Sequence, residues 1–122
     1  MSLPDPASLP LHGIKVVEFT HMVMGPTCGM VLGDLGAEVI KIEPIDGDKT
    51  RGLLGSGAGF FSMFNRNKKS MAVNINTPEG RKIVQELIAT ADILCENFKP
   101  GTMKKLQLDY ASLKVQFPRL IY

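Results

Sequence analysis

The sequence lacks the features that mark several large classes of protein. Its 122 residues carry a formal net charge of only +2, and no basic run is interleaved with aromatic residues, so nothing indicates a nucleic-acid partner. No apolar stretch is long enough to cross a bilayer, and no secretory signal peptide is evident. These absences predict one soluble, cytoplasmic globular domain that binds neither membrane nor nucleic acid.

Cysteine and histidine are also scarce, with two residues of each. His12 and His21 are too far apart and too poorly accompanied for metal-ligand spacing, so we expect no metal ion. Cys28 and Cys95 both fall at positions that we interpret as buried and apolar. Two unpaired cysteines are typical of a reducing compartment.

Residues 14–43 predict a strand, a helix and a second strand. The apolar, β-branched run 14–19 indicates a strand buried on both faces. Gly25-Pro26 is expected to open a helix that ends near Leu35, and residues 38–42 form the next strand. The long connection requires the two strands to be parallel. The helix is expected to turn one apolar stripe inward: Cys28, Val31, Leu32 and Leu35.

Gly25, Gly29 and Gly33 recur every fourth residue on that helix. Each interior glycine costs about 1 kcal/mol relative to alanine, which predicts a compensating close contact. We favour close packing on the sheet over a ligand, although the helix N-terminus is a ready anion site. Glu43 stands where a dinucleotide fold has its ribose-binding acid. The G-x-G-x-x-G fingerprint of that fold is nevertheless absent.

The remaining chain repeats the alternation of helices and strands. After a long loop, 44–59, that we expect to be functional, a short apolar helix at 60–64 is interpreted as a plug over the sheet. The basic run 66–69 is typical of a solvated face, with an anion site as the alternative. Further predicted elements are strands at 71–75, 93–95 and 119–122, a helix from Pro78 to Ala91, a short amphipathic segment at 102–108, and a helix after Asp109 that turns Tyr110, Leu113 and Phe117 inward.

The last predicted strand has no returning helix after it. Because a parallel strand normally continues into another crossover, we expect this α/β unit to be the truncated N-terminal part of a larger domain. Residues 1–10 are polar and rich in proline, and we interpret them as a leader or as residues added for expression. The ordered unit is expected to cover residues 11–122.

Several sequence runs, taken in order, resemble the class III CoA-transferases, which include formyl-CoA and carnitine CoA-transferases and α-methylacyl-CoA racemases. These runs are FTHMVMGPTCGMVLGDLGAEVIKIEP, GDKTRG, FFSMFNRNKKSMAVNINTPEGR and ADILCENFKPGTM. The resemblance covers residues 11–122. It implies a Rossmann-like parallel sheet with flanking helices, and subunits that interlock as a homodimer.

The family moves CoA between an acyl-CoA and a small carboxylic acid through an aspartate, which forms an anhydride and then a thioester. The resemblance places that nucleophile beyond the end of this chain, so none of the six aspartates present is assigned a catalytic role, and the 122 residues alone are expected to be inactive. The resemblance also implies CoA contacts, which are expected at His21, Met22, Val23, Met24, Val73, Asn74, Ile75, Asn76, Asn97, Phe98, Lys99 and Lys105. Most of these positions fall at or just past the carboxyl ends of predicted strands, where ligands of open α/β sheets gather.

Two departures from the family bear on the substrate. Formyl-CoA transferases have glutamine at the position of Val23 and arginine at that of Pro44, which argues against oxalate as the acceptor. Two alternatives to a transferase stay open at this point. One is an acyl-CoA racemase of the same family, and the other is a nucleotide-binding or interaction module without catalysis.

Overall fold

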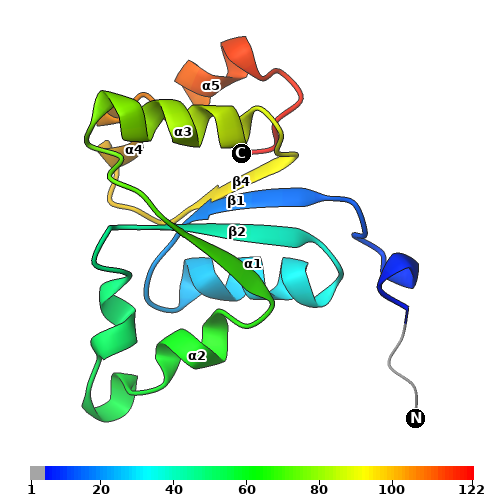
Figure 1. Cartoon of the computed structure of the whole chain (residues 1–122), viewed down its shortest axis with the longest axis vertical. Coiled ribbons are helices and arrows are strands. Elements are labelled where there is room, and N and C mark those ends of the chain that lie inside the picture. The colour runs from blue at the N-terminus through cyan, green and yellow to red at the C-terminus, as the bar shows by residue number, and fades with distance from the viewer. Residues whose placement is uncertain (1–4) are drawn as a thin grey trace.

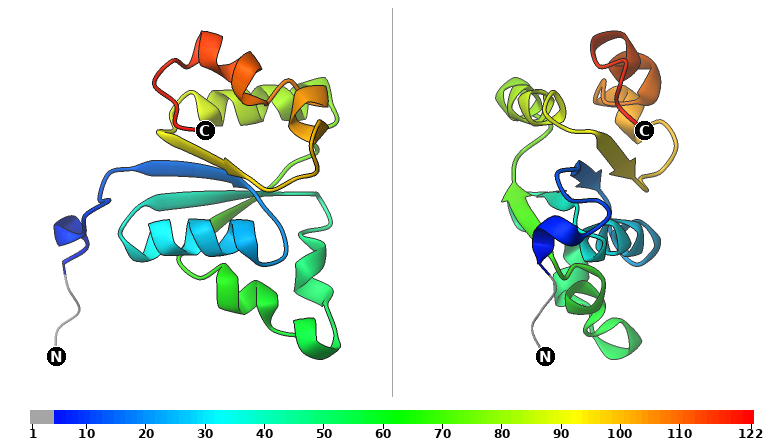
Figure 2. Two further views of the ribbon diagram at one scale, coloured as in Figure 1. Left: turned by 180° about the vertical axis from the view of Figure 1, so that it is seen from behind. Right: turned by 90° about the vertical axis from the view of Figure 1, so that its right-hand side faces the viewer.

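A computed structural model describes residues 5–122 and arranges them as an α/β fold, in which a parallel sheet lies between two layers of helices (Figures 1 and 2). The strand order is β3-β2-β1-β4. The strands are β1 (Lys15–Phe19), β2 (Glu38–Glu43), β3 (Lys68–Ala72) and β4 (Ile93–Glu96). The helices are α1 (Met24–Asp34), α2 (Phe60–Phe64), α3 (Pro78–Ile88), α4 (Thr102–Lys105) and α5 (Tyr110–Gln116), with 3₁₀ turns η1 (Pro6–Ser8), η2 (Lys49–Gly52) and η3 (Gly55–Gly57).

The predicted fold class is confirmed, since all three strand pairs are parallel. The predicted strand at 119–122 is present as one parallel bridge between Ile121 and Ile93. Residues 1–4 of the expected leader lie outside the described residues, and Pro6–Ser8 form η1. Within residues 5–122 no helix has both the length and the apolar character needed to cross a membrane.

One face of the sheet carries the main hydrophobic core, beneath α3, α4 and α5 (Figure 2). The predicted start of α3 is confirmed, because Thr77 Oγ1 accepts a hydrogen bond from Gly80 N at 3.0 Å. Ile83 and Tyr110, expected to point inward, are exposed instead. The buried residues of this core are Val17, Phe19, Ile40, Ile42, Val73, Val84, Ile88, Leu94, Met103, Leu106, Leu108 and Leu113.

Helix α1 covers the other face, and the predicted orientation of its apolar stripe was wrong. Cys28, Val31 and Leu35 are exposed, whereas Pro26 and Gly29 are buried against the sheet. The helix also begins at Met24, so Pro26 lies inside its first turn rather than opening it. The glycine side faces the sheet because Glu18 of β1 occupies the space that a side chain at Gly29 would need. The close packing expected of these glycines is confirmed at Gly25 and Gly29, whereas Gly33 has room for a Cβ.

The third strand begins three residues earlier than predicted. Lys68 and Lys69 pair in register with Val39 and Ile40 of β2, so residues 73–75 lie past the end of the strand. The displacement is possible because the basic side chains find acidic partners. Arg66 pairs with Asp34 at 2.6 Å, Lys68 with Glu18 at 2.8 Å, and Lys69 with Glu38 at 2.9 Å. The prediction that this run forms a solvated face was therefore wrong at Lys68, whose side chain is only 3% exposed.

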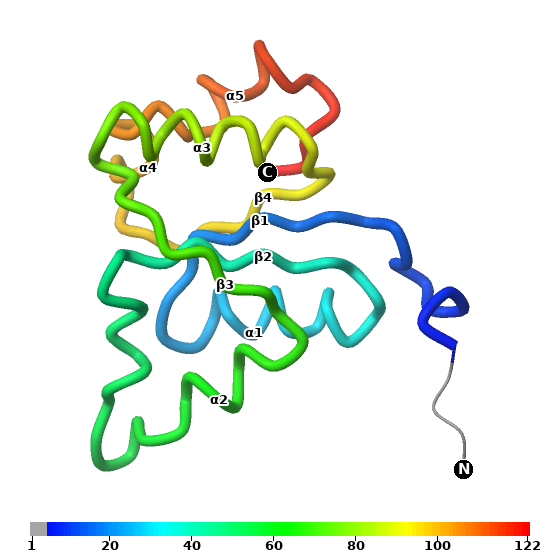
Figure 3. The backbone as a smooth tube through the Cα atoms, in the orientation of Figure 1, coloured from blue at the N-terminus to red at the C-terminus, as the bar shows by residue number. Residues whose placement is uncertain are grey.

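The segment between β2 and β3 leaves the sheet, passes through η2, η3 and α2, and returns on the side of α1 (Figure 3). The sequence was interpreted to place helix α2 as a plug over the sheet, and this interpretation was wrong. The helix packs against η2 and α1, and the Arg51 guanidinium lies 3.8 Å from the centre of the Phe61 ring. This contact is within the range of a cation–π interaction.

A layer of charged side chains lies buried beneath α1. Glu18 Oε1 lies 2.8 Å from Lys68 Nζ and 3.8 Å from Lys41 Nζ, and Lys41 Nζ lies 3.1 Å from Asp48 Oδ2. All four side chains are at most 5% exposed. Two carboxylates therefore face two ammonium groups, and the cluster is electrically balanced. Because unpaired buried charges are costly, each member depends on the others.

A second ion pair, at the end of β2, joins the buried Glu43 to the half-exposed Arg51. The Glu43 carboxylate accepts from Arg51 Nε at 2.8 Å, Arg51 Nη2 at 2.7 Å, Asp48 N at 2.8 Å and Ser70 Oγ at 2.7 Å. The Arg51 guanidinium lowers the pKa of Glu43 to about 2, with the other donors opposing the effect of burial. These bonds fasten the loop after β2 to the sheet.

We predict that Gly29→Ala destabilises the fold and that Gly33→Ala does not. A Cβ on Gly29 would overlap Glu18 Oε2, which forces a shift within the buried charge layer and costs about 3 kcal/mol. A Cβ on Gly33 lies 3.4 Å from Asn67 O, an ordinary contact, so alanine there is neutral or stabilises the helix by up to about 1 kcal/mol. Urea unfolding of both variants measures the difference. Equal stabilities would refute close packing at Gly29.

We also predict that the free energy of unfolding falls as the pH drops from about 5 to about 2. The folded-state pKa of Glu43 lies below its ordinary value of 4.5, so its contribution is complete above pH 4.5 and is lost as the carboxylate protonates. The loss is about 2–3 kcal/mol, since solvent screens part of the pair with the half-exposed Arg51. Glu43→Gln should flatten this dependence, whereas the exposed Glu79→Gln should leave it unchanged. Unfolding curves across this range would contradict the assignment if all three proteins had the same slope.

Candidate functional site

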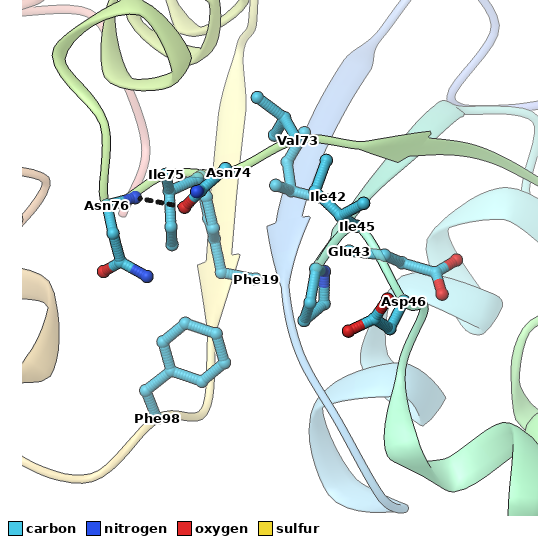
Figure 4. Close-up of a pocket in the computed structure, with 11 residues that line it drawn as sticks. Phe19, Ile42, Glu43, Ile45, Asp46, Val73, Asn74, Ile75, Asn76 and Phe98 are labelled. Atoms are coloured by element: carbon cyan, nitrogen blue, oxygen red, sulfur yellow. Dashed lines mark hydrogen bonds between the residues drawn. The ribbon is translucent and has the colours of Figure 1, made fainter.

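Two adjoining pockets open at the carboxyl edge of the sheet, between the ends of β1, β2 and β4 and the residues that follow β3. Figure 4 shows the first of them. Their volumes are about 330 and 440 Å³, and they share Ile42, Pro44 and Phe98. The first is also lined by Phe19, Glu43, Ile45, Asp46, Val73, Asn74, Ile75 and Asn76. The second is also lined by Thr20, His21, Met22, Asp48, Lys49 and Thr50.

Phe98 is the aromatic residue common to both pockets. Its ring lies 5.7 Å from the His21 ring at an interplanar angle of 31°, and 6.4 Å from the Phe19 ring in an edge-on arrangement. Its backbone N–H donates to Glu96 Oε2 at 2.8 Å. Phe98 is thus fixed at both its backbone and its ring, and it presents a rigid apolar surface at the junction of the pockets.

The loop between β1 and α1 is held by side chains from two distant segments. Asn97 Oδ1 accepts from His21 N at 3.0 Å, and Asn97 Nδ2 donates to His21 O at 2.9 Å. Thr50 Oγ1 accepts from Met22 N at 3.1 Å. Met22 has φ of 64°, a left-handed conformation that a non-glycine residue adopts at some cost. These bonds hold the loop in that conformation.

The loop is also tied to the buried charges. Thr50 Oγ1 donates to Asp48 Oδ1 at 2.7 Å, and Lys41 Nζ donates to Thr20 O. Burial raises the pKa of Asp48, but the hydrogen bonds from Thr50 and Lys41 outweigh it, so the net pKa is lowered. Asp48 is therefore a charged acceptor that orients Thr50, and Thr50 in turn orients Met22.

The bonds made by Asn97 and Thr50 change what the loop offers a ligand. The N–H groups of His21 and Met22 both donate within the protein, so neither is free for a phosphate oxygen. The anion site expected just before α1 therefore does not have these two donors. Glu43, noted as the possible ribose-binding acid, accepts four hydrogen bonds from protein groups and serves the structure.

The structure brings together part of the predicted set of site residues. His21, Met22 and Phe98 line the larger pocket, and residues 73–76 line the smaller one. Asn97 lies behind the loop that it holds. The other predicted residues line neither pocket: Val23 is the N-cap of α1, Met24 is 82% exposed, and Lys99 and Lys105 are exposed after β4 and on α4.

The loop after β2 was predicted to be functional, but none of its residues was assigned to the site, and the contribution of β2 itself was missed. Ile42, Pro44 and Ile45 form walls, while Asp48, Lys49 and Thr50 close the larger pocket. The rule that ligands gather at carboxyl strand ends applies to β2 as much as to its neighbours. Together with the unusual length of the following loop, it is a signal that could have identified these residues.

The arrangement suits an organic ligand with an apolar portion. Within residues 5–122, no three His, Cys, Asp or Glu side chains gather where they could share a metal ion. Most of the exposed wall surface in both pockets is apolar, although polar residues also line them, as is typical of sites for organic ligands.

Comparison with known proteins shows what this architecture resembles. Succinyl-CoA:glutarate CoA-transferase from Homo sapiens is 44% identical over 118 residues, which cover 93% of this chain and 27% of the human protein. Formyl-CoA:oxalate CoA-transferase from Escherichia coli is 43% identical and is covered to 29%. The crystal structure of Rv3272 from Mycobacterium tuberculosis superposes with a TM-score of 0.89 at 43% identity, over 94% of this chain and 32% of that one.

A CAIB/BAIF family protein from Brucella suis gives a TM-score of 0.86 at 45% identity and is covered to 32%. The chain thus spans about a third or less of the relatives that it matches. Residues 11–122 match the sequence profile described as CoA-transferase family III, and the chain belongs to this family.

Proposed function

We propose that this chain is the N-terminal part of an enzyme that transfers CoA between an acyl-CoA and a small carboxylic acid. The observation that carries the proposal is the double pocket at the carboxyl edge of the sheet, joined by Phe98. Relatives with 42–44% identity are CoA-transferases by name. Several of those names specify short acids such as glutarate, oxalate and malate, which supports a small carboxylic acid as the acceptor.

The pocket walls support CoA as the ligand. The pantetheine arm is long and largely apolar between its amides, and it fits beside His21, Met22 and Phe98. The smaller pocket, whose lining includes Ile42, Val73 and Ile75, has apolar surface that suits the flat face of an adenine ring. Asn74 and Asn76 add polar groups at its rim.

The phosphates of CoA would meet cations that are not already paired. Arg66, Lys68 and Lys69 have acidic partners, so the anion site considered for this run loses its support. Lys49, Lys99 and Lys105 form no ion pair with any residue in 5–122. Lys49 lines the larger pocket directly. We propose that Lys99 and Lys105 contact the phosphates from outside the pocket, and that Val23 and Met24, where the β1–α1 loop enters α1, also contact CoA.

The catalytic step requires a nucleophile that we place outside these 122 residues. In the proposed reaction an aspartate carboxylate attacks the thioester carbonyl and releases CoA thiolate, which leaves an acyl anhydride on the enzyme. None of the aspartates in the chain is proposed for this role. Asp48, for example, is committed to Lys41 and Thr50. We further propose that the whole enzyme is an interlocked homodimer. We place it in the cytoplasm, in keeping with the two unpaired cysteines.

We predict that the 122-residue chain alone shows no CoA transfer and that the longer polypeptide encoded by the same reading frame does. The test is exchange between succinyl-CoA and glutarate, with formyl-CoA and oxalate as a second pair, followed by chromatography of the thioesters. The chain should lack turnover because it does not hold the nucleophile. Turnover by the short chain would overturn this assignment, and no transfer by the long polypeptide with any short dicarboxylate would overturn the proposed function.

A second prediction concerns the cations at the pocket edge. Lys105→Ala should weaken CoA binding by up to about tenfold, equivalent to about 1.4 kcal/mol for one phosphate contact at an exposed site. Binding of pantetheine, which has no phosphates, should be unchanged. Lys69→Ala is the matched control, because that ammonium pairs with Glu38 at the opposite end of the sheet. Calorimetric titrations that give equal losses for both variants, or none, would show that Lys105 is merely solvated.

A further inference from the structure

The two cysteines of the chain lie side by side although 67 positions separate them in the sequence. Cys28 is on α1 and Cys95 is on β4, and their sulfur atoms are 4.0 Å apart. Both are free thiols. Cys28 is exposed and Cys95 is half-buried, so one thiol of the pair faces the solvent and the other lies beneath it.

The placement follows from the packing described above. Glycine at position 29 lets α1 approach the sheet closely, and Cys95 stands next to Glu18 in the register of β4 on β1. Cys28 is therefore exposed on α1 and not buried in the core, which is why it does not belong to an inward-facing apolar stripe. A sulfur separation of 4.0 Å must shrink to about 2.05 Å for a bond to form.

We propose that Cys28 and Cys95 form a reversible intrachain disulfide when the protein meets a peroxide. The exposed Cys28 thiol reduces one peroxide molecule, whose O–O bond breaks, and becomes a sulfenic acid while water leaves. The Cys95 sulfur then attacks the Cys28 sulfur, the S–O bond breaks, and a second water leaves with the proton of Cys95. Two thiols and one hydrogen peroxide thus give one disulfide and two waters.

The order in which the two thiols react follows from their exposure, since Cys28 is exposed and Cys95 is half-buried. Burial raises the pKa of Cys95 to about 12, with Cys28 and Glu18 acting in the same direction, so Cys95 is a poor first target for an oxidant. Its sulfur lies 4.0 Å from that of Cys28, which makes it the thiol positioned to attack a sulfenic acid formed there. The sequence holds no third cysteine, so this pair is the one intrachain bridge open to the chain.

The bridge would connect α1, the helix that follows the β1–α1 loop, to the strand that precedes Asn97, which holds the loop. Cys95 lies two residues before Asn97, whose side chain bonds to His21, and Cys28 lies on the first turns of the helix that follows the loop. Oxidation would fix α1 against β4 next to the pocket. A closed loop of this length also stabilises the folded chain. This inference does not depend on the proposed function.

The test is treatment of the purified chain with one equivalent of hydrogen peroxide. We expect a monomer that has lost two hydrogen atoms by intact mass, no thiol left for alkylation, and a single Cys28–Cys95 linked peptide. The Tm should rise by about 5 °C or more and return after dithiothreitol is added. Sulfinic or sulfonic acid at Cys28, or disulfide-linked dimers without the internal bridge, would overturn the proposal.

Two serine variants separate the roles of the thiols. In Cys95→Ser the oxidation should stop at sulfenic acid on Cys28, which dimedone captures. In Cys28→Ser the remaining Cys95 should resist the same peroxide dose. Rapid oxidation of Cys95 in the latter variant would contradict the order of steps, and the absence of a dimedone adduct in the former would contradict the sulfenic acid.

Discussion

The neutralised charge layer under α1 is the constraint on which the rest of this structure depends. Lys41 and Lys68 are buried with Glu18 and Asp48, and removing one partner would leave another charge unpaired at a cost of about 3–5 kcal/mol. The layer fixes three things at once. Glu18 requires glycine at position 29 on the helix above it, Lys41 holds the carbonyl of Thr20, and Lys68 donates to Pro26 O at 2.7 Å. Strand, helix and connecting loop are thereby held in one geometry.

This constraint connects the interior of the protein to its pocket. Asp48 orients Thr50, and Thr50 and Asn97 take up the two N–H groups of the β1–α1 loop that would otherwise face a ligand. The loop is therefore preorganised rather than open to capture by phosphate. Under the proposed function, recognition at this edge would fall mainly to apolar contact with Phe98 and its neighbours, with the unpaired lysines contributing from more exposed positions.

Sequence reasoning reached the fold because the periodicities were strong, and it failed where charges were buried. The alternation of strands and helices, the cap at Thr77 and the parallel pairing all follow from local patterns. Lys41 and Lys68 do not, since a lysine in a strand usually indicates a solvated face. Their burial depends on acids that are distant in the chain. Because Lys68 and Lys69 were interpreted as solvated, β3 was predicted to begin three residues too late. Strand β2 was left out of the candidate site, although the rule that ligands gather at carboxyl strand ends applies to it as well.

The glycines of α1 show why a familiar fingerprint was absent in a Rossmann-like fold. In dinucleotide folds the glycines after the first strand let a pyrophosphate approach the backbone. Here Gly25 is closed off by the side chains of Thr20 and Asn97, and Gly29 by Glu18. The space left by the missing side chains is occupied by the protein's own polar groups. The helix can then lie close over the buried charges. The two candidate pockets open instead at the carboxyl edge of the sheet, where the ends of β1, β2 and β4 and the residues after β3 form their walls.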